Sequence, residues 1–296
     1  MKYATSAAFR AALEQRLLAQ ARERRDPVVR LRKLVVFERL LARLLIVAPD
    51  RRVLKGALAL DFRLGGRSRT TNDMDLDRQD SEQAATVDFI AAQSVDVGDY
   101  FTFSIERTGQ LDSLIEGAAV RYHIVAGLAG RLFEEAIVDV GFGEPLILGP
   151  EALPAPDLLR FAGIERITVP ALPLEQQIAE KVHAYTRRYG GTRGSTRVKD
   201  LIDVVLIAKH TTVEVGRLRK SLHVVFERRG SHSLPAVLSP PPFNWSVAYR
   251  KLAVEVELDP DIESGYNVAA SLLDPVLGAA VAGGANWDPV VGMWVP

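Results

Sequence analysis

The 296 residues include 37 lysines and arginines and 37 aspartates and glutamates, so the formal net charge at pH 7 is zero. This balance excludes a global field that would draw the whole protein to nucleic acid or to a membrane. The chain has no cysteine, which excludes a disulfide scaffold, a thiolate metal site and a cysteine nucleophile. We therefore expect a globular, cytoplasmic protein without a membrane segment, long enough for two domains.

The first half of the chain predicts two long helices followed by alternating strands and helices. Leucines recur at helical spacing in the second helix, and Pro27 suits its first position. The elements expected up to residue 142 are helices at 6–25 and 27–47, a strand at 52–55, a helix at 58–64, a strand at 73–77, a helix at 81–93, and strands at 101–107, 120–125 and 136–142.

The second half predicts helices after a break marked by prolines at 145, 150, 154 and 156. The expected helices cover 174–189, 197–209, 213–229, 247–256 and 262–277, with a proline-rich linker at 235–242 and an apolar tail that packs back on the body. These elements predict an α/β (α+β) fold with N-terminal helices at 1–50, an α/β domain at 51–165 and a helical C-terminal domain at 166–296.

Two aspartates one residue apart, Asp73 and Asp75, are the most informative functional signal. Alternate residues of a strand point to the same face, so their carboxylates would lie side by side while Met74 faces a core. Adjacent carboxylates repel each other unless a cation or a proton relieves them, and Mg²⁺ accepts such oxygen ligands. The alternative is a surface turn in which Asp73, Asp75 and Asp77 are only solvated.

Gly56 and Ala57, which follow Lys55, form a small-residue turn ahead of this pair. Because a backbone with small side chains lets a phosphate approach its N–H groups, the turn and the aspartates together indicate a metal–nucleotide site.

Asp139 is a third candidate carboxylate, within an apolar segment that reads as a buried strand. An isolated buried charge is costly, so Asp139 requires a partner or a metal. If its strand neighbours the Asp73–Asp75 strand, the three carboxylates converge. The alternative places Asp139 at a strand edge that faces water.

A helical segment carries Lys181, and the next one carries Asp200 and Asp203 on one face. Lys181 could bind a triphosphate, or it could be a surface lysine paired with Glu180 or Glu175. Asp203 enters an apolar run and should have a partner, for which Lys181 or an arginine is suitable. A buried structural ion pair between the two helices is the alternative.

Basic residues, mostly arginines, crowd two segments and suit contact with phosphates, although basic helix faces can also be simply solvated. The clusters comprise Arg16, Arg22, Arg24, Arg25, Arg30, Arg32, Lys33, Arg39 and Arg43, and then Arg187, Arg188, Arg193, Arg197 and Lys199. The five histidines lack metal-ligand spacing and a consistent partner, so we interpret them as packing or surface residues.

Taken in order, these motifs resemble the AbiEii/AbiGii toxin nucleotidyltransferases, which include the MenT toxins and belong to the DNA polymerase β superfamily. The resemblance spans roughly residues 30–260 and rests on Lys55-Gly56-Ala57-x-Ala59-Leu60, Thr70-Thr71-Asn72-Asp73-Met74-Asp75-Leu76-Asp77, Asp139, Glu180-Lys181 and Arg197-x-Lys199-Asp200-Leu201-x-Asp203.

The resemblance implies a polymerase-β-type domain with a mixed sheet, in a toxin that is paired with an antitoxin protein or kinase. Such a toxin transfers nucleotides from a nucleoside triphosphate to RNA. In the MenT branch the acceptor is the 3′ end of tRNA, which is extended by pyrimidines, as from CTP, so that aminoacylation fails.

Carried over residue by residue, the resemblance makes Asp73, Asp75 and Asp139 catalytic Mg²⁺ ligands. Lys181 would bind the triphosphate, and Asp203 would orient it or complete the active site. The remaining residues expected to bind nucleotide are Lys55, Gly56, Ala57, Arg67, Arg69, Thr71 and Asp200. Thr71 is also a candidate for regulatory phosphorylation. Ala57 departs from the family, where glycine or serine is usual.

Two alternatives accompany this prediction. In one, the chemistry is kept and the acceptor is a small molecule or a protein hydroxyl. In the other, the protein is a non-catalytic nucleotide-binding module whose carboxylates hold a structural ion.

Overall fold

The chain divides into two compact units, which the computed structural model describes for residues 1–111, 119–143, 145–187 and 197–296. The first unit comprises Met1–Gly66, Thr70–Pro145 and Pro150–Ala171, and the second comprises Arg67–Arg69, Leu146–Gly149 and Leu172–Pro296. Arg67–Arg69 and Leu146–Gly149 thus belong to the second unit, although the residues on both sides of each segment belong to the first.

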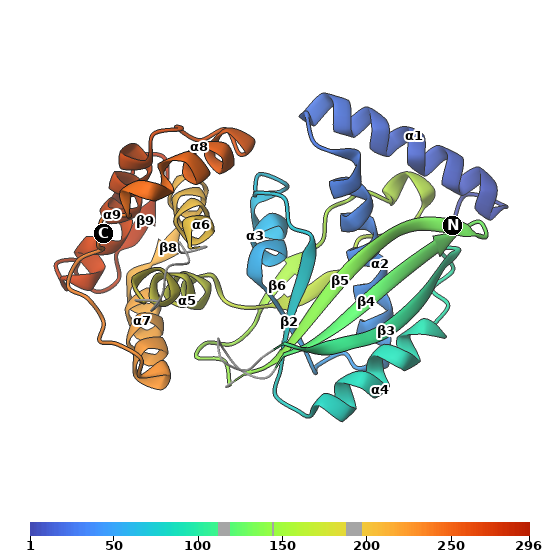
Figure 1. The fold of residues 1–296 in the computed structure, drawn as a ribbon, viewed down its shortest axis with the longest axis horizontal. Coiled ribbons are helices and arrows are strands. Elements are labelled where there is room, and N and C mark those ends of the chain that lie inside the picture. The colour runs from blue at the N-terminus through green and yellow to red at the C-terminus, as the bar shows by residue number, and fades with distance from the viewer. Residues whose placement is uncertain (112–118, 144, 188–196) are drawn as a thin grey trace. The chain divides into compact units, whose positions relative to one another are not determined.

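A mixed sheet forms the centre of the first unit (Figure 1). Within the described ranges its strand order is β3-β4-β5-β2-β1-β7-β6. The pairs β2–β5 and β1–β7 are parallel, and the remaining pairs are antiparallel. The strands are β1 Val53–Lys55, β2 Asp73–Arg78, β3 Phe101–Leu111, β4 Ala119–Leu128, β5 Arg131–Phe142, β6 Glu151–Pro154 and β7 Thr168–Ala171. The predicted mixed α/β architecture is confirmed.

Four α-helices belong to the described part of the first unit. They are α1 Ser6–Arg24, α2 Val28–Val47, α3 Gly56–Leu64 and α4 Glu82–Gln93, and a single 3₁₀ turn covers Arg160–Ala162. Thr5 and Ser81 cap α1 and α4, because their hydroxyls accept the N–H groups of Ala8 and Ala84 at 3.2 Å. Helices α2 and α4 pack against each other and on one face of the sheet (Figure 1).

Buried and partly exposed residues alternate along β2, so the two faces of this strand carry different side chains. Met74 and Leu76 are completely buried against the core, so Asp73, Asp75 and Asp77 project from the other side. The predicted strand at 73–77 is thus confirmed.

The structure differs from the predicted elements of this unit at several places, and β3, β4 and β5 extend beyond the predicted 101–107, 120–125 and 136–142. Helix α3 begins at Gly56, two residues early, and Pro27 is the N-cap of α2 rather than its first residue. Strands β6 and β7 were not predicted, because they are four residues each and their prolines read as a break. An edge position tolerates the proline at the end of β6.

The second unit is mainly helical, with α5 Leu174–Thr186, α6 Val198–His210, α7 Val215–Arg229, α8 Ser246–Glu255 and α9 Ile262–Leu277, and a 3₁₀ turn at Phe243–Trp245. Residues 188–189 of the predicted helix at 174–189 lie outside the described residues.

The apolar tail packs back on the second unit, as predicted. It forms β9 Asn286–Asp288 and β10 Met293–Val295, which join β8 Val213–Glu214 in a small sheet absent from the prediction. The indole N–H of Trp287 donates to the carbonyl of Ala208 at 2.7 Å, and only 1% of Trp287 is exposed. Among the described residues, no helix combines the length and the apolar character needed to cross a bilayer.

Candidate active site

Strands β2 and β5 bring Asp73, Asp75 and Asp139 to the same face of the sheet. Asp75 lies directly opposite Asp139 in the parallel register of the two strands, and Asp73 lies two residues before Asp75. Paired residues on neighbouring strands share a face, as do alternate residues on one strand. The expectation that the Asp139 strand neighbours β2 is confirmed, and Asp139 is not on an edge strand because β5 lies between β4 and β2.

Arg121, which the sequence analysis did not identify, lies opposite Asp139 on β4. Its Nε and Nη2 atoms donate to the two carboxylate oxygens of Asp139, each at 2.8 Å. These hydrogen bonds, followed by the charges of Asp139, Asp73 and Asp75, raise the pKa of the Arg121 guanidinium. Asp139 was expected to need a partner, and this partner is Arg121 of the adjacent strand β4.

This ion pair bears on the predicted Mg²⁺ site. Across the described ranges, no group of three or more acidic, histidine or cysteine side chains is arranged to hold a metal ion. The oxygen donors of Asp73 and Asp75 still fit Mg²⁺, which usually takes one or two carboxylates together with substrate phosphates. Asp139 can join them only if Arg121 releases it.

Gly56 is the first residue of α3 and lies against the Asp75 carboxylate. Its φ is +68°, and a Cβ built there would be 2.0 Å from Oδ2 of Asp75. Only glycine fits both the backbone conformation and the close approach. Glycine was predicted here because it admits a phosphate, but the structure shows that it is needed to make room for Asp75. The N-terminus of α3 remains the predicted phosphate position.

Two further residues predicted to bind nucleotide contact carboxylates of β2. The Thr71 hydroxyl lies 2.8 Å from Oδ1 of Asp73 and 3.1 Å from its carbonyl, and Thr71 is 8% exposed. Lys55 Nζ lies 3.2 Å from Oδ1 of Asp77. Thr71 therefore fixes the orientation of Asp73.

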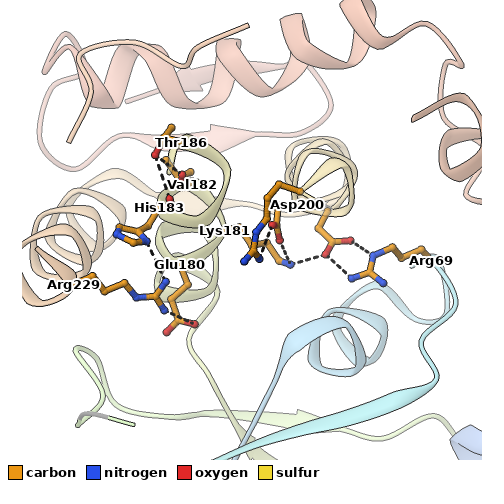
Figure 2. Close-up of polar contacts among 10 residues, drawn as sticks. Arg69, Glu180, Lys181, Val182, His183, Thr186, Asp200 and Arg229 are labelled. Carbon is orange, nitrogen blue, oxygen red and sulfur yellow. Dashed lines mark hydrogen bonds and ion pairs between the residues drawn. The ribbon is translucent and has the colours of Figure 1, made fainter. Parts of the chain in front are cut away.

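In the second unit, Lys181 and Asp203 form a buried ion pair between α5 and α6 (Figure 2). Lys181 Nζ lies 2.5 Å from Oδ2 of Asp203 and 3.5 Å from Oδ1 of Asp200. The Arg69 guanidinium donates to both oxygens of Asp203, at 3.0 and 3.2 Å. The prediction that Asp203 has a partner is confirmed, and Lys181 is not a surface lysine, since it is 8% exposed.

The charges in this cluster outweigh the effect of burial on the pKa values. Burial alone would raise the pKa of Asp203, but the charges of Lys181 and Arg69 lower it below its usual value. Burial would lower the pKa of Lys181, but Asp203 and Asp200 raise it. Arg197 also pairs with Asp200, at 3.4 Å, so the cluster joins three cations and two carboxylates. Arg67 is exposed.

The histidines are packing or surface residues as predicted, since His183 is buried and His210 and His223 are exposed, but His183 and His232 share a partner that was not predicted. The Ser231 hydroxyl lies 2.9 Å from Nε2 of His183 and 2.9 Å from Nδ1 of His232. Burial, reinforced by the charge of Arg229, lowers the pKa of His183 to about 4. Figure 2 shows Arg229 between His183 and Glu180.

Three arginines of the first basic cluster are internal, whereas Arg16, Arg22, Arg24 and Arg25 of the same cluster are exposed. Arg30, Arg39 and Arg43 are buried, and they pair with Asp61 at 2.6 Å, Glu38 at 2.9 Å and Asp99 at 2.7 Å. These three arginines cannot present their charge to RNA in this fold, so that part of the prediction is wrong. In the second cluster, residues 188–196 lie outside the described residues.

Comparison with known proteins decides the family. The family model described as "Nucleotidyl transferase AbiEii toxin, Type IV TA system" matches residues 39–277, which is more than half of the chain. The chain belongs to the AbiEii nucleotidyltransferase toxin family. This AbiEii protein is therefore a nucleotidyltransferase and the toxin of a toxin–antitoxin system, with a nucleotide substrate and an antitoxin partner. No curated protein sequence gives a significant match.

The fold of this AbiEii protein is similar to that of the solved structure of MenT4. MenT4, the nucleotidyltransferase toxin Rv2826c from Mycobacterium tuberculosis H37Rv, is 20% identical, and the alignment covers 92% of this chain and 99% of MenT4 with a TM-score of 0.54. JHP933 from Helicobacter pylori is 18% identical over 84% of this chain and 94% of its own, with a TM-score of 0.45. At these identities the likeness is one of fold.

Proposed function

We propose that this toxin is a Mg²⁺-dependent enzyme that transfers a pyrimidine nucleotide, as from CTP, to the 3′ end of tRNA and so blocks aminoacylation and translation. The observation that carries the proposal is the placement of Asp73 and Asp75 side by side on β2, opposite Asp139 of β5. Family membership supports the transfer chemistry, and the resemblance to the MenT branch supports the acceptor and the base. A tRNA acceptor places the activity in the cytoplasm.

Asp73 and Asp75 would hold the Mg²⁺, with Asp139 as the third candidate carboxylate. When bound there, the ion supplies positive charge at the α-phosphate and acidifies the acceptor hydroxyl. The protein itself orients the reactants. Thr71 fixes Asp73 through its hydroxyl, and Gly56 allows Asp75 to lie against the start of α3.

The triphosphate would be bound by backbone N–H groups and by cations. The N-terminus of α3, which begins at Gly56 and Ala57, presents the positive end of the helix dipole to an anion. Lys55, at the end of β1 in the same unit, is proposed to contact the phosphates as well.

In the second unit, Lys181, Arg67 and Arg69 are the proposed phosphate-binding cations. Asp203 and Asp200 are positioning residues in this proposal, because they hold Lys181 and Arg69 by ion pairs. The cations gathered in this cluster would attract an anionic ligand.

Thr71 is also the proposed target of an antitoxin kinase. A phosphate there would put about two negative charges next to Asp73, in place of the hydroxyl that now donates to it. The expected result is repulsion of the nucleotide phosphates and loss of transfer. A protein antitoxin that covers the site would be the other way to neutralise the toxin.

Labelled nucleotides test the proposal directly. The full chain is incubated with each of the four α-³²P-labelled nucleoside triphosphates, total RNA and a cleared cell extract, with Mg²⁺ or with EDTA. The proposal predicts label from CTP or UTP on tRNA, and none with EDTA. Label on a protein or a small molecule would identify a different acceptor, and nucleotide binding without any labelled product would indicate a non-catalytic module.

A further inference from the structure

One row of residues runs across neighbouring strands of the first unit at the level of Asp75. Lys55 of β1, Asp75 of β2, Asp139 of β5 and Arg121 of β4 are successive register partners. Such residues share a face of the sheet. Arg121 is therefore the cation built into the same surface as the carboxylates.

Arg121 brings a positive charge to the carboxylates of this surface. Asp73, Asp75 and Asp139 carry three negative charges, and Arg121 neutralises that of Asp139 through two hydrogen bonds of 2.8 Å. A divalent ion bound to Asp73 and Asp75 would therefore lie close to a built-in cation.

We propose that Arg121 is an internal counter-cation of the carboxylate site and competes with a divalent metal ion for Asp139. In the nucleotide-free protein, Arg121 holds Asp139, and a metal ion would bind through Asp73 and Asp75. Asp139 becomes a ligand only when Arg121 turns away. The inference rests on the proposed function, because it assumes that Asp73 and Asp75 bind a metal.

The contacts of Asp139 support competition. Both of its oxygens accept from Arg121, so the bidentate guanidinium takes up one acceptor site on each oxygen. A guanidinium and a divalent ion that shared this carboxylate closely would repel each other. Each cation therefore weakens the binding of the other at Asp139.

The surroundings of Arg121 allow it to move. Its side chain is 37% exposed, unlike the buried guanidinium of Arg43, which is 1% exposed. On the side away from Asp139, the register partner of Arg121 on β3 is Gly109, and a Cβ built there would meet no atom within 4 Å. A half-exposed arginine beside open space can exchange partners, whereas a buried one cannot.

Binding of Mn²⁺ without nucleotide tests the competition by a readout independent of activity. Free Mn²⁺ is measured by electron paramagnetic resonance in titrations of the full chain, for the wild type, Arg121→Gln and the double variant Arg121→Gln/Asp139→Asn. Circular dichroism confirms that each variant is folded.

Arg107→Gln is the matched control. Arg107 is on β3 of the same sheet, but it pairs with Glu82 of α4 and lies opposite the buried Tyr122, on the other face. The Arg107→Gln variant removes one positive charge from the same sheet, and Arg107 does not contact the carboxylates of Asp73, Asp75 or Asp139.

Arg121→Gln should bind Mn²⁺ about tenfold more tightly than the wild type, because a positive charge next to the ion is gone and Asp139 is released. Arg107→Gln should change the affinity by less than about twofold, because solvent and salt screen the distant charge. The double variant should lose most of the gain, since the gain requires the Asp139 carboxylate. If Arg121→Gln is not folded, Arg121→Lys provides the same test, with a gain of about threefold, because lysine keeps the charge but not the two bonds.

Equal or weaker Mn²⁺ binding by a folded Arg121→Gln would overturn the competition and leave the proposed transfer intact. A gain that persists in the double variant would also overturn it, because Asp139 would not be the ligand that Arg121 withholds. If no variant binds Mn²⁺, both the competition and the metal site of the proposed function are wrong.

Discussion

Replacement of Gly56 by alanine separates the two requirements that the structure places on this residue. The backbone of Gly56 has a φ of +68°, and an alanine in this left-handed region costs about 1–2 kcal/mol. The new Cβ would also lie 2.0 Å from Oδ2 of Asp75. Since such a contact needs roughly 3 Å or more, the carboxylate must move by about 1 Å.

Gly65 is the matched control at the other end of α3. Its φ is +61°, and a Cβ built there meets no atom within 4 Å. Gly65→Ala therefore carries the backbone strain of Gly56→Ala without the displacement of Asp75. Both variants should lose about 1–2 kcal/mol of unfolding free energy in urea titrations.

The two variants should differ in nucleotidyl transfer. A displacement of about 1 Å in a catalytic group can cost about a hundredfold in rate, so Gly56→Ala should lose about that factor in single-turnover transfer of labelled CTP to tRNA. Gly65→Ala should keep its rate within about threefold, because its strain is remote from Asp75. Equal rates for the two variants would refute the reasoning that Gly56 exists to accommodate Asp75.

Three further predictions follow from the same contacts. Thr71→Val should lower the transfer rate about tenfold with less than about 1 kcal/mol lost in stability, because Asp73 loses one hydrogen bond, and Thr71→Ser should restore the rate in the same assay. Asp203→Asn should cost about 3–5 kcal/mol in urea unfolding, since it leaves Lys181 buried without its counter-charge, and a loss below about 1 kcal/mol would contradict the buried pair. Folding lowers the pKa of His183 from 6.5 to about 4, so between these pH values the unfolded chain binds a proton at this histidine that the folded chain does not. Stability should fall as the pH drops from about 6.5 toward 4, and His183→Asn should flatten this slope in urea midpoints.

Local sequence patterns were sufficient for the elements that position the site. Alternation of charged and apolar residues predicts β2 and the face that carries Asp73 and Asp75, because a strand has a period of two. A helical pattern likewise predicts α9, whose bounds, Ile262–Leu277, match the predicted ones. The requirement that a buried aspartate has a partner correctly predicted the ion pair of Asp203 with Lys181.

Contacts between distant segments could not be predicted in this way. The pairing of Arg121 with Asp139 depends on the neighbour relation and register of β4 and β5, which no local pattern contains. In the same way, Arg43 reads as a surface cation of a basic helix, whereas its partner is Asp99, more than fifty residues later. Strand β6, with its proline, is defined by its pairing with β7 rather than by its own propensity.

The net charge of the Lys181–Asp203–Arg69 cluster in the second unit could not be predicted from the sequence. The sequence predicted Lys181 or an arginine as the partner of Asp203, and the fold joins both Lys181 and Arg69 to it. The property that matters for an anionic ligand is the net charge of the whole cluster, and this is known only when the partners are known.

The central claim is that Asp73 and Asp75 of β2 form the metal-dependent transfer centre. The most direct measurement is the single-turnover rate of labelled CTP transfer to tRNA, across a Mg²⁺ titration, for Asp75→Asn and for Glu106→Gln, an exposed residue of β3 that serves as the control. The account predicts that Asp75→Asn lowers the rate by about a thousandfold or more at every Mg²⁺ concentration, because the charge that holds the ion is lost, while Glu106→Gln keeps the wild-type rate. A folded Asp75→Asn that transfers within about tenfold of the wild type would contradict it.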